Sequence, residues 1–192
     1  VIGRNALVPG RGMTAVIPEL IAEARESYAG LPAHLVTAGH TLASLLRADG
    51  VLSIAEIMGQ RSQRLYTLVD LARLDPDLAK KLTAAEEAIY EAADDPWVNW
   101  NERDLAASLE AAGLSGVTVN LVETAAEARI QPATLDRWFG VAPAGERSSY
   151  HQRLAPALTP EELTAVENLY RGQLTGQSVS WRSVTAHAVA RK

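Results

Sequence analysis

The chain of 192 residues contains no cysteine, few aromatic residues and no long apolar run. Without cysteine, the protein cannot form a disulfide framework, a thiolate metal site or a cysteine nucleophile. No apolar run approaches the roughly 20 residues that a membrane-spanning helix needs. Because aromatic residues make up only 5% of the chain, the core must consist mainly of Leu, Val, Ile and Ala. We therefore expect one cytoplasmic domain with no membrane partner.

Lysine is also scarce, and the charge is unevenly distributed. Residues 1–128 carry ten Arg and Lys against eighteen Asp and Glu, whereas residues 129–192 carry eight against five. The candidates for a basic surface are Arg129, Arg137, Arg147, Arg153 and Arg171. They are spread over several short elements and form no single stripe, so nucleic acid is a weak candidate partner. A solvated surface is the simpler interpretation.

The sequence lacks the motifs that most directly indicate catalysis in an α/β protein. Gly3, Gly10 and Gly12 match neither the G-x-G-x-x-G pattern nor a Walker A loop. The four histidines are scattered, which argues against a metal site. No G-x-S-x-G elbow supports a nucleophilic serine. We therefore predict no metal ligand and no cofactor-binding residue within this chain, and the catalytic residues stay unknown.

Strand and helix patterns alternate along the chain and indicate an α/β fold. The clearest strand is 51–57, which is short and almost wholly apolar, as expected of a strand covered on both faces. A helix over 37–48 and a turn at Asp49-Gly50 precede it, which makes half of a βαβ unit. Further strands are expected at 116–124, where apolar and polar residues alternate, and at 185–191. The remaining periodic segments predict helices at 62–74, 77–93, 101–112, 132–139, 148–158 and 159–174.

Two groups of residues are candidates for binding a substrate. Arg4 and Asn5 follow the apolar triplet Val1-Ile2-Gly3, which we interpret as the end of a strand, and open α/β sheets bind ligands at the carboxyl ends of strands. The alternative is that Asn5 only holds the turn by local hydrogen bonds.

The second group lies in the loop 94–100. Trp97 and Trp100 bracket Asn99 there, and such aromatic side chains can form a lid or a stacking surface. The simpler alternative, which we favour, is that the two rings fill a gap between helices.

The helix that ends in Leu-Leu-Arg-Ala-Asp-Gly (45–50), followed by Val-Leu-Ser-Ile-Ala-Glu (51–56), closely resembles the fifth-strand region of class I S-adenosylmethionine-dependent methyltransferases. By the same resemblance, 1–7 is the end of the fourth strand, 101–112 is the last helix, and 116–124 with 185–191 form the closing antiparallel pair. The resemblance implies the second half of a doubly wound, Rossmann-like methyltransferase sheet with an added helical insertion.

Several stretches are similar, more narrowly, to the methyltransferase-like domain fused behind bacterial replication-associated recombination AAA+ ATPases. These stretches are 59–66, 84–90, 95–100, 135–139 and 179–183. The family's cofactor-binding loop, its ribose-binding acidic residue and its adenine-contacting part have no counterpart in the chain and would lie upstream of Val1. Only the position after the fourth strand, Arg4 and Asn5, can be carried over as a place for substrate-contacting groups.

We therefore expect a single partial domain over 1–192. Sheet strands and flanking helices would occupy 1–130, a helical insertion 131–176 and the closing strand 177–192. Because the chain starts with Val inside an apolar triplet, we expect a fragment of a longer protein, whose first partner is the missing N-terminal half of its own domain.

Two functions remain open at this point. In the first, the chain is the C-terminal portion of a methyltransferase-like domain. The longer protein would use S-adenosylmethionine, and the chain alone would bind no cofactor and be inactive. In the second, it is a non-catalytic accessory or docking module of a DNA replication and recombination AAA+ ATPase.

Overall fold

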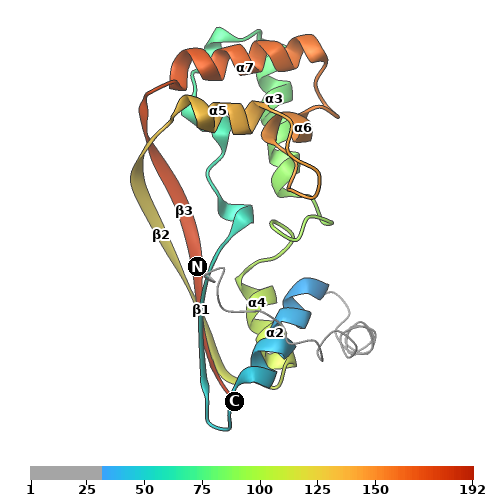
Figure 1. Cartoon of the computed structure of the whole chain (residues 1–192), viewed down its shortest axis with the longest axis vertical. Coiled ribbons are helices and arrows are strands. Elements are labelled where there is room, and N and C mark those ends of the chain that lie inside the picture. The colour runs from blue at the N-terminus through green and yellow to red at the C-terminus, as the bar shows by residue number, and fades with distance from the viewer. Residues whose placement is uncertain (1–31) are drawn as a thin grey trace. The chain divides into compact units, whose positions relative to one another are not determined.

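The computed structural model describes residues 32–192 (Figure 1). The described residues cluster into two compact units. Unit 1 contains residues 32–61, 93–123 and 183–192, and unit 2 contains residues 62–92 and 124–182. The predicted strand end at 1–7, with Arg4 and Asn5, lies outside the described residues.

The sheet has three strands in the order β1-β3-β2: β1 (Val51–Ile57), β3 (Ser178–Arg191) and β2 (Ser115–Arg129). The central strand, β3, pairs antiparallel with β1, from Val51 opposite Arg191 to Ile57 opposite Thr185. The protein is therefore a mixed α/β structure with an open, antiparallel three-stranded sheet.

Two helices of unit 1, α2 (Ala33–Leu45) and α4 (Glu102–Ala111), pack against each other on one side of the strands (Figure 1). Their close approach requires Gly39, because a Cβ atom there would lie 2.9 Å from the carbonyl oxygen of Ser108. Beneath them, β3 presents small side chains at alternate positions. These are Ala186, Ala188 and Ala190, all fully buried.

The opposite face of these strands keeps apolar side chains in contact with solvent. Val51 is 50% exposed and Ile57 is 47% exposed. Val189 shares this face and is 40% exposed. Its partner in the β1–β3 register is Ser53, which lies two residues after Val51 and four before Ile57 and therefore on the same face as both. No described helix of unit 1 covers this face.

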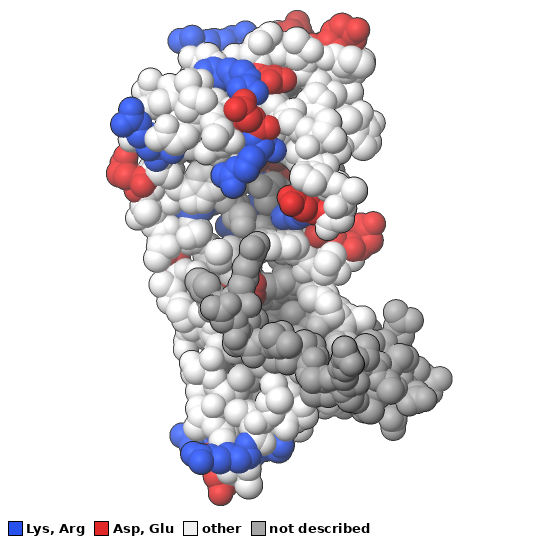
Figure 2. All heavy atoms as spheres, viewed as in Figure 1, with Lys and Arg blue, Asp and Glu red and all other residues white. Residues whose placement is uncertain are grey.

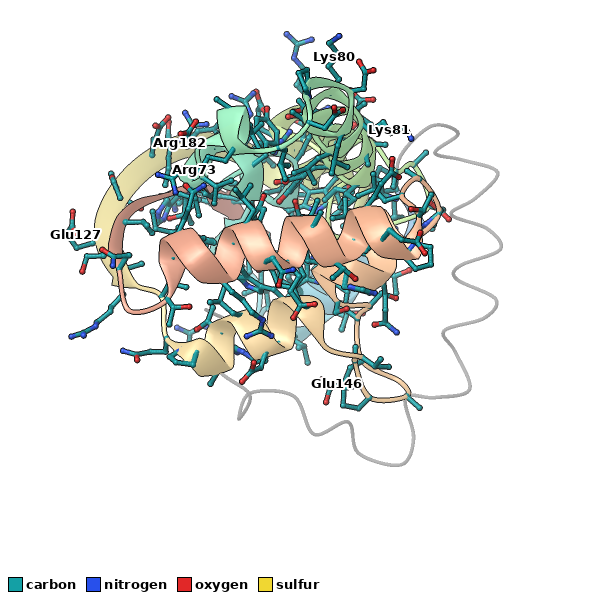
Figure 3. All side chains as sticks on the ribbon, turned by 90° about the horizontal axis from the view of Figure 1, so that it is seen from above. Arg73, Lys80, Lys81, Glu127, Glu146 and Arg182 are labelled. Atoms are coloured by element: carbon teal, nitrogen blue, oxygen red, sulfur yellow. The ribbon has the colours of Figure 1, made fainter. Side chains whose placement is uncertain are left out.

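Unit 2 is largely helical and has an apolar core of its own. It contains the helices α3 (Pro76–Tyr90), α5 (Pro132–Phe139), α6 (Tyr150–Leu154) and α7 (Pro160–Leu174) and the short 3₁₀ turns η2 (Leu65–Leu68) and η3 (Leu71–Arg73). In Figure 1, α5 and α7 lie side by side, and Figure 3 shows the same pairing from above. The centre of the core is formed by Leu82, Leu135, Leu154, Val166 and Tyr170, all fully buried.

Several predicted elements are confirmed. The strand 51–57 has the bounds expected, and α4, α5 and α7 begin and end within a residue or two of their predicted limits. The caps explain this agreement. Asn101 and Thr159 each accept a hydrogen bond from a backbone amide of the following helix and complete a capping box.

The predicted helix 62–74 is wrong. The structure has only the 3₁₀ turns η2 and η3 there, with extended residues at Arg64, Val69 and Leu74. The apolar spacing is helical, but the amides of Leu65 and Tyr66 donate to the side chain of Glu86 instead of to helical carbonyls. A tertiary contact therefore overrides the local pattern.

Other predicted bounds shift. Helix α2 begins four residues before the predicted start, directly after Pro32, and α6 covers only 150–154 of the expected 148–158. Strands β2 and β3 are longer than 116–124 and 185–191. The predicted helical insertion, 131–176, falls between β2 and β3 and belongs to unit 2 together with residues 62–92. The description of 1–192 as one partial domain stays a prediction.

Candidate functional site

A cavity of about 370 Å³ opens in unit 1 at the carboxyl end of β1. Ile54 and Glu56, on the face of β1 that the helices cover, line one wall together with Ile57 at the end of the strand, and residues 34–42 of α2 line another. The loop that carries Trp97 and Trp100, together with Leu105 and Leu109 of α4, completes it. All of its lining residues belong to unit 1.

The tryptophan loop is held by local hydrogen bonds from Asp95. Its Oδ1 accepts from the amide of Trp97 at 3.0 Å, and its carbonyl accepts from the amides of Val98 and Asn99, each at 3.0 Å. The side-chain amide of Asn99 donates to the carbonyl of Ala93 at 2.9 Å. These bonds form a compact turn that sets the positions of both tryptophans.

Gly59 joins this loop to the end of β1. A Cβ atom at Gly59 would lie 2.0 Å from the carbonyl oxygen of Trp97, a distance that no side chain can tolerate. The loop backbone can therefore rest on the strand end only because residue 59 has no side chain.

The structure places the predicted site residues in different ways. Trp97 and Trp100 both line the cavity, with Trp97 49% exposed and Trp100 only 5% exposed. Trp100 also packs in the core of unit 1 with Leu105 and Leu109, so it fills space between elements as well as lining the cavity. Asn99 stabilises the turn instead of facing the cavity, although its Oδ1 is buried without a hydrogen-bond partner.

The only polar side chains on the cavity wall, among the residues described, are those of His34 and Glu56. Burial lowers the pKa of His34 from its usual value, so this imidazole is neutral at neutral pH. Its Nε2 is buried and has no hydrogen-bond partner. Neither residue is predicted from the sequence, because neither belongs to a recognisable motif. The one available signal is the place of Glu56 near the end of a strand.

The described residues do not fit a nucleotide-like cofactor. Such a cofactor needs a glycine-rich turn between a strand and a helix, where backbone amides meet the ligand. Gly59 is the glycine that follows β1, and its open side is filled by the carbonyl of Trp97. Between 32 and 192, no group of three or more His, Asp or Glu side chains is placed to hold a metal ion.

A second polar cluster lies in the core of unit 2 and was not predicted. Glu86 is fully buried, and its carboxylate accepts hydrogen bonds from the amides of Leu65 and Tyr66 and from the hydroxyl of Tyr150. Because Tyr150 gives its one proton to Glu86, the hydroxyl of Tyr170 donates to Tyr150 at 3.2 Å. Burial raises the pKa of Glu86, and the three hydrogen bonds oppose that shift.

Neighbouring side chains also hold residues 64–66 against α3. Arg64 lies 3.7 Å over the ring of Tyr90, and its Nε is 3.0 Å from Glu87. The hydroxyl of Tyr66 donates to Glu87 at 2.7 Å. Four of the five stretches on which the narrower resemblance rests contribute residues to unit 2, and there they hold its elements together.

The face of unit 2 that Figure 2 shows has no continuous basic stripe. Figure 2 shows its Lys and Arg side chains interspersed with Asp and Glu on the face in view. Figure 3 shows Lys80 of α3, Glu127 of β2 and Glu146 of the loop before α6 pointing outward. Of the five arginines predicted as a basic surface, Arg171 pairs with Asp136 at 2.9 Å and with Glu167 at 2.7 Å.

No family model matches the chain, and no curated protein matches it by sequence. None of the helices in residues 32–192 is long and apolar enough to cross a membrane.

We expect Gly59→Ala to lower the free energy of unfolding by about 2 kcal/mol or more, because the loop must move away from the strand end. The matched control is Gly172→Ala, in the last turn of α7, where an added Cβ meets nothing within 4 Å. That control should stabilise the chain by about 0.5–1 kcal/mol. Urea unfolding of both variants tests this, and equal effects would contradict the close contact.

We expect Glu86→Ala to destabilise the chain by about 3 kcal/mol or more, because two backbone amides and a tyrosine hydroxyl lose their acceptor. Glu91→Ala, at an exposed position just after α3, is the control and should change stability by less than about 0.5 kcal/mol. Thermal unfolding followed by circular dichroism measures both. A Glu86 variant as stable as its control would show that the buried carboxylate does not hold the 62–66 segment.

Proposed function

We propose that this chain is the C-terminal portion of an S-adenosylmethionine-dependent methyltransferase-like domain, with the β1 cavity on the side of the methyl acceptor. The observation that carries the proposal is the cavity itself. It lies at the carboxyl end of β1, the strand that resembles the family's fifth strand, and the tryptophan loop forms part of its wall.

The strand arrangement supports the proposal. The resemblance implies a closing antiparallel pair after the fifth strand, and β2 and β3 are neighbours in an antiparallel sheet, with β3 against β1. The helical insertion expected within that pair corresponds to α5, α6 and α7.

The exposed apolar face of the sheet in unit 1 also supports it. Doubly wound sheets carry helices on both faces, whereas α2 and α4 cover only one face here. Val51, Ile57 and Val189 would lie under a further layer of the same domain. That layer is the proposed N-terminal half.

In this proposal the described residues position an acceptor and exclude water, and the cofactor binds to residues outside them. Trp97 and Trp100 would confine the acceptor against β1, and catalysis would follow from proximity and orientation. The bound cofactor would supply an electrophilic methyl group. No described residue is assigned to its binding.

A second candidate is a non-catalytic accessory or docking module of a DNA-maintenance AAA+ ATPase. One observation favours it. The stretches that resemble that fusion mostly contribute to the core of unit 2, where Glu86, Tyr150 and Tyr170 build a fixed network and not an open site. For the 192-residue chain on its own we favour this role, since the described residues lack a cofactor cradle.

The methyltransferase proposal predicts that a longer protein, which includes the residues upstream of Val1, binds S-adenosylmethionine in titration calorimetry. The 192-residue chain alone should give no heat of binding with the same compound. Absence of binding by the longer protein would refute the proposal.

The docking proposal predicts a mobility shift with DNA that weakens as salt is raised, because contacts to phosphate release counterions. The variant Arg137→Gln removes an exposed charge of α5 and should weaken the shift. If the mobility of the DNA does not change up to high protein concentration, the module does not contact nucleic acid. Its docking partner would then be a protein.

A further inference from the structure

The cavity at the end of β1 has walls that select for charge as well as for shape. Most of the lining is aliphatic or aromatic, and Leu42, Ile54 and Leu105 are typical of it. The volume of about 370 Å³ is within the range of sites that hold small organic molecules. A ligand for this cavity therefore needs an apolar body.

The described part of the wall holds one formal charge, and it is negative. Glu56 is half-buried on β1 and makes no ion pair with a described residue. No Arg or Lys side chain of residues 32–192 lines the cavity. His34 does not compensate the charge, because burial keeps its imidazole neutral. A carboxylate in an apolar wall is stabilised most by a cation that reaches it.

The two indole rings favour the same kind of ligand. Trp is the side chain whose ring face attracts organic cations most strongly. Trp100 is almost fully buried and Trp97 is half-exposed, so one ring lies inside the cavity wall and the other where the wall meets solvent. The turn built by Asp95 and the contact at Gly59 hold both rings in place before a ligand arrives.

We infer that this cavity binds an organic ammonium cation, an amine carried on an aromatic or aliphatic body, with the charge near Glu56 and the body against Trp97 and Trp100. This assignment deepens the proposed function, since it names the class of molecule on the acceptor side of the same site. The negative charge of the described wall disfavours carboxylates and phosphates.

Three probes that share a phenylethyl group and differ in charge test the inference with the 192-residue chain. They are phenethylamine, which is a cation at neutral pH, ethylbenzene, which is neutral, and 3-phenylpropionate, which is an anion. In titration calorimetry we expect phenethylamine to bind at least about tenfold more tightly than 3-phenylpropionate, a difference of about 1.4 kcal/mol. Ethylbenzene should lie between them.

The variant Glu56→Gln should remove most of the preference for the cation while ethylbenzene binds as before. The control Glu110→Gln removes an exposed carboxylate of α4 that does not line the cavity, and it should leave all three affinities unchanged. Trp97→Leu, at a half-exposed position, should weaken the cation more than the neutral probe.

Equal or tighter binding of the anion, or no binding of any probe, would overturn the inference. The comparison of the three probes on the unsubstituted chain needs no variant, so a folding defect of Glu56→Gln leaves the test intact. Failure of this inference can be distinguished from failure of the proposed function. Cation binding by this chain is measured without S-adenosylmethionine, and a longer protein that fails to bind S-adenosylmethionine would refute methyl transfer alone.

Discussion

The backbone of Gly59 and the carbonyl of Trp97 approach so closely that no side chain fits between them. This contact fixes the loop 94–100 against the carboxyl end of β1, and the cavity exists because the loop is held there. It also explains why two tryptophans can serve both packing and binding. Trp100 is anchored in the core of unit 1, and Trp97, three residues earlier on a turn closed by Asp95, is left at the solvent side. A flexible loop would not hold either ring in a fixed position. Ordering such a loop on binding would reduce the affinity for the ligand.

The two units use buried polar groups differently. In unit 2, the carboxylate of Glu86 meets three donors and is enclosed by tyrosines, so it stabilises one arrangement of the chain. In unit 1, the carboxylate of Glu56 lies on a cavity wall with no described cation beside it. A satisfied buried charge is typical of a structural role, and a carboxylate that lines an apolar cavity is typical of a binding role. This contrast is the physical reason for assigning function to unit 1.

The sequence predicts the parts of the fold that local chemistry determines. Strand β1 was predicted residue for residue because it is a short apolar run between turns, and α4 and α7 were predicted because Asn101 and Thr159 are strong helix caps. The failure at 62–74 has the opposite cause. The amides of Leu65 and Tyr66 bond to Glu86, about twenty residues later in the chain, and no local pattern reveals that partner. The grouping of 62–92 with the helical insertion depends on the same long-range contacts.

In the candidate site, too, local features can be predicted from the sequence and long-range contacts cannot. Trp97 and Trp100 are candidates from the sequence because they bracket Asn99 in a loop, and both line the cavity. His34 and Glu56 were missed because neither belongs to a recognisable motif, and only the folded structure brings them to one cavity. Asn99 was chosen for its position between the two tryptophans, but its amide serves the turn itself.

The most direct test of the account is to map where an organic cation binds on the 192-residue chain. Backbone amide signals in ¹H–¹⁵N NMR spectra would be followed during titration with phenethylamine. The account predicts that the largest shifts fall on the start of α2, the end of β1 and the loop 94–100, with residues of unit 2 unchanged. Shifts centred on unit 2, or spread evenly over the acidic surface, would contradict the assignment of the binding site to the β1 cavity.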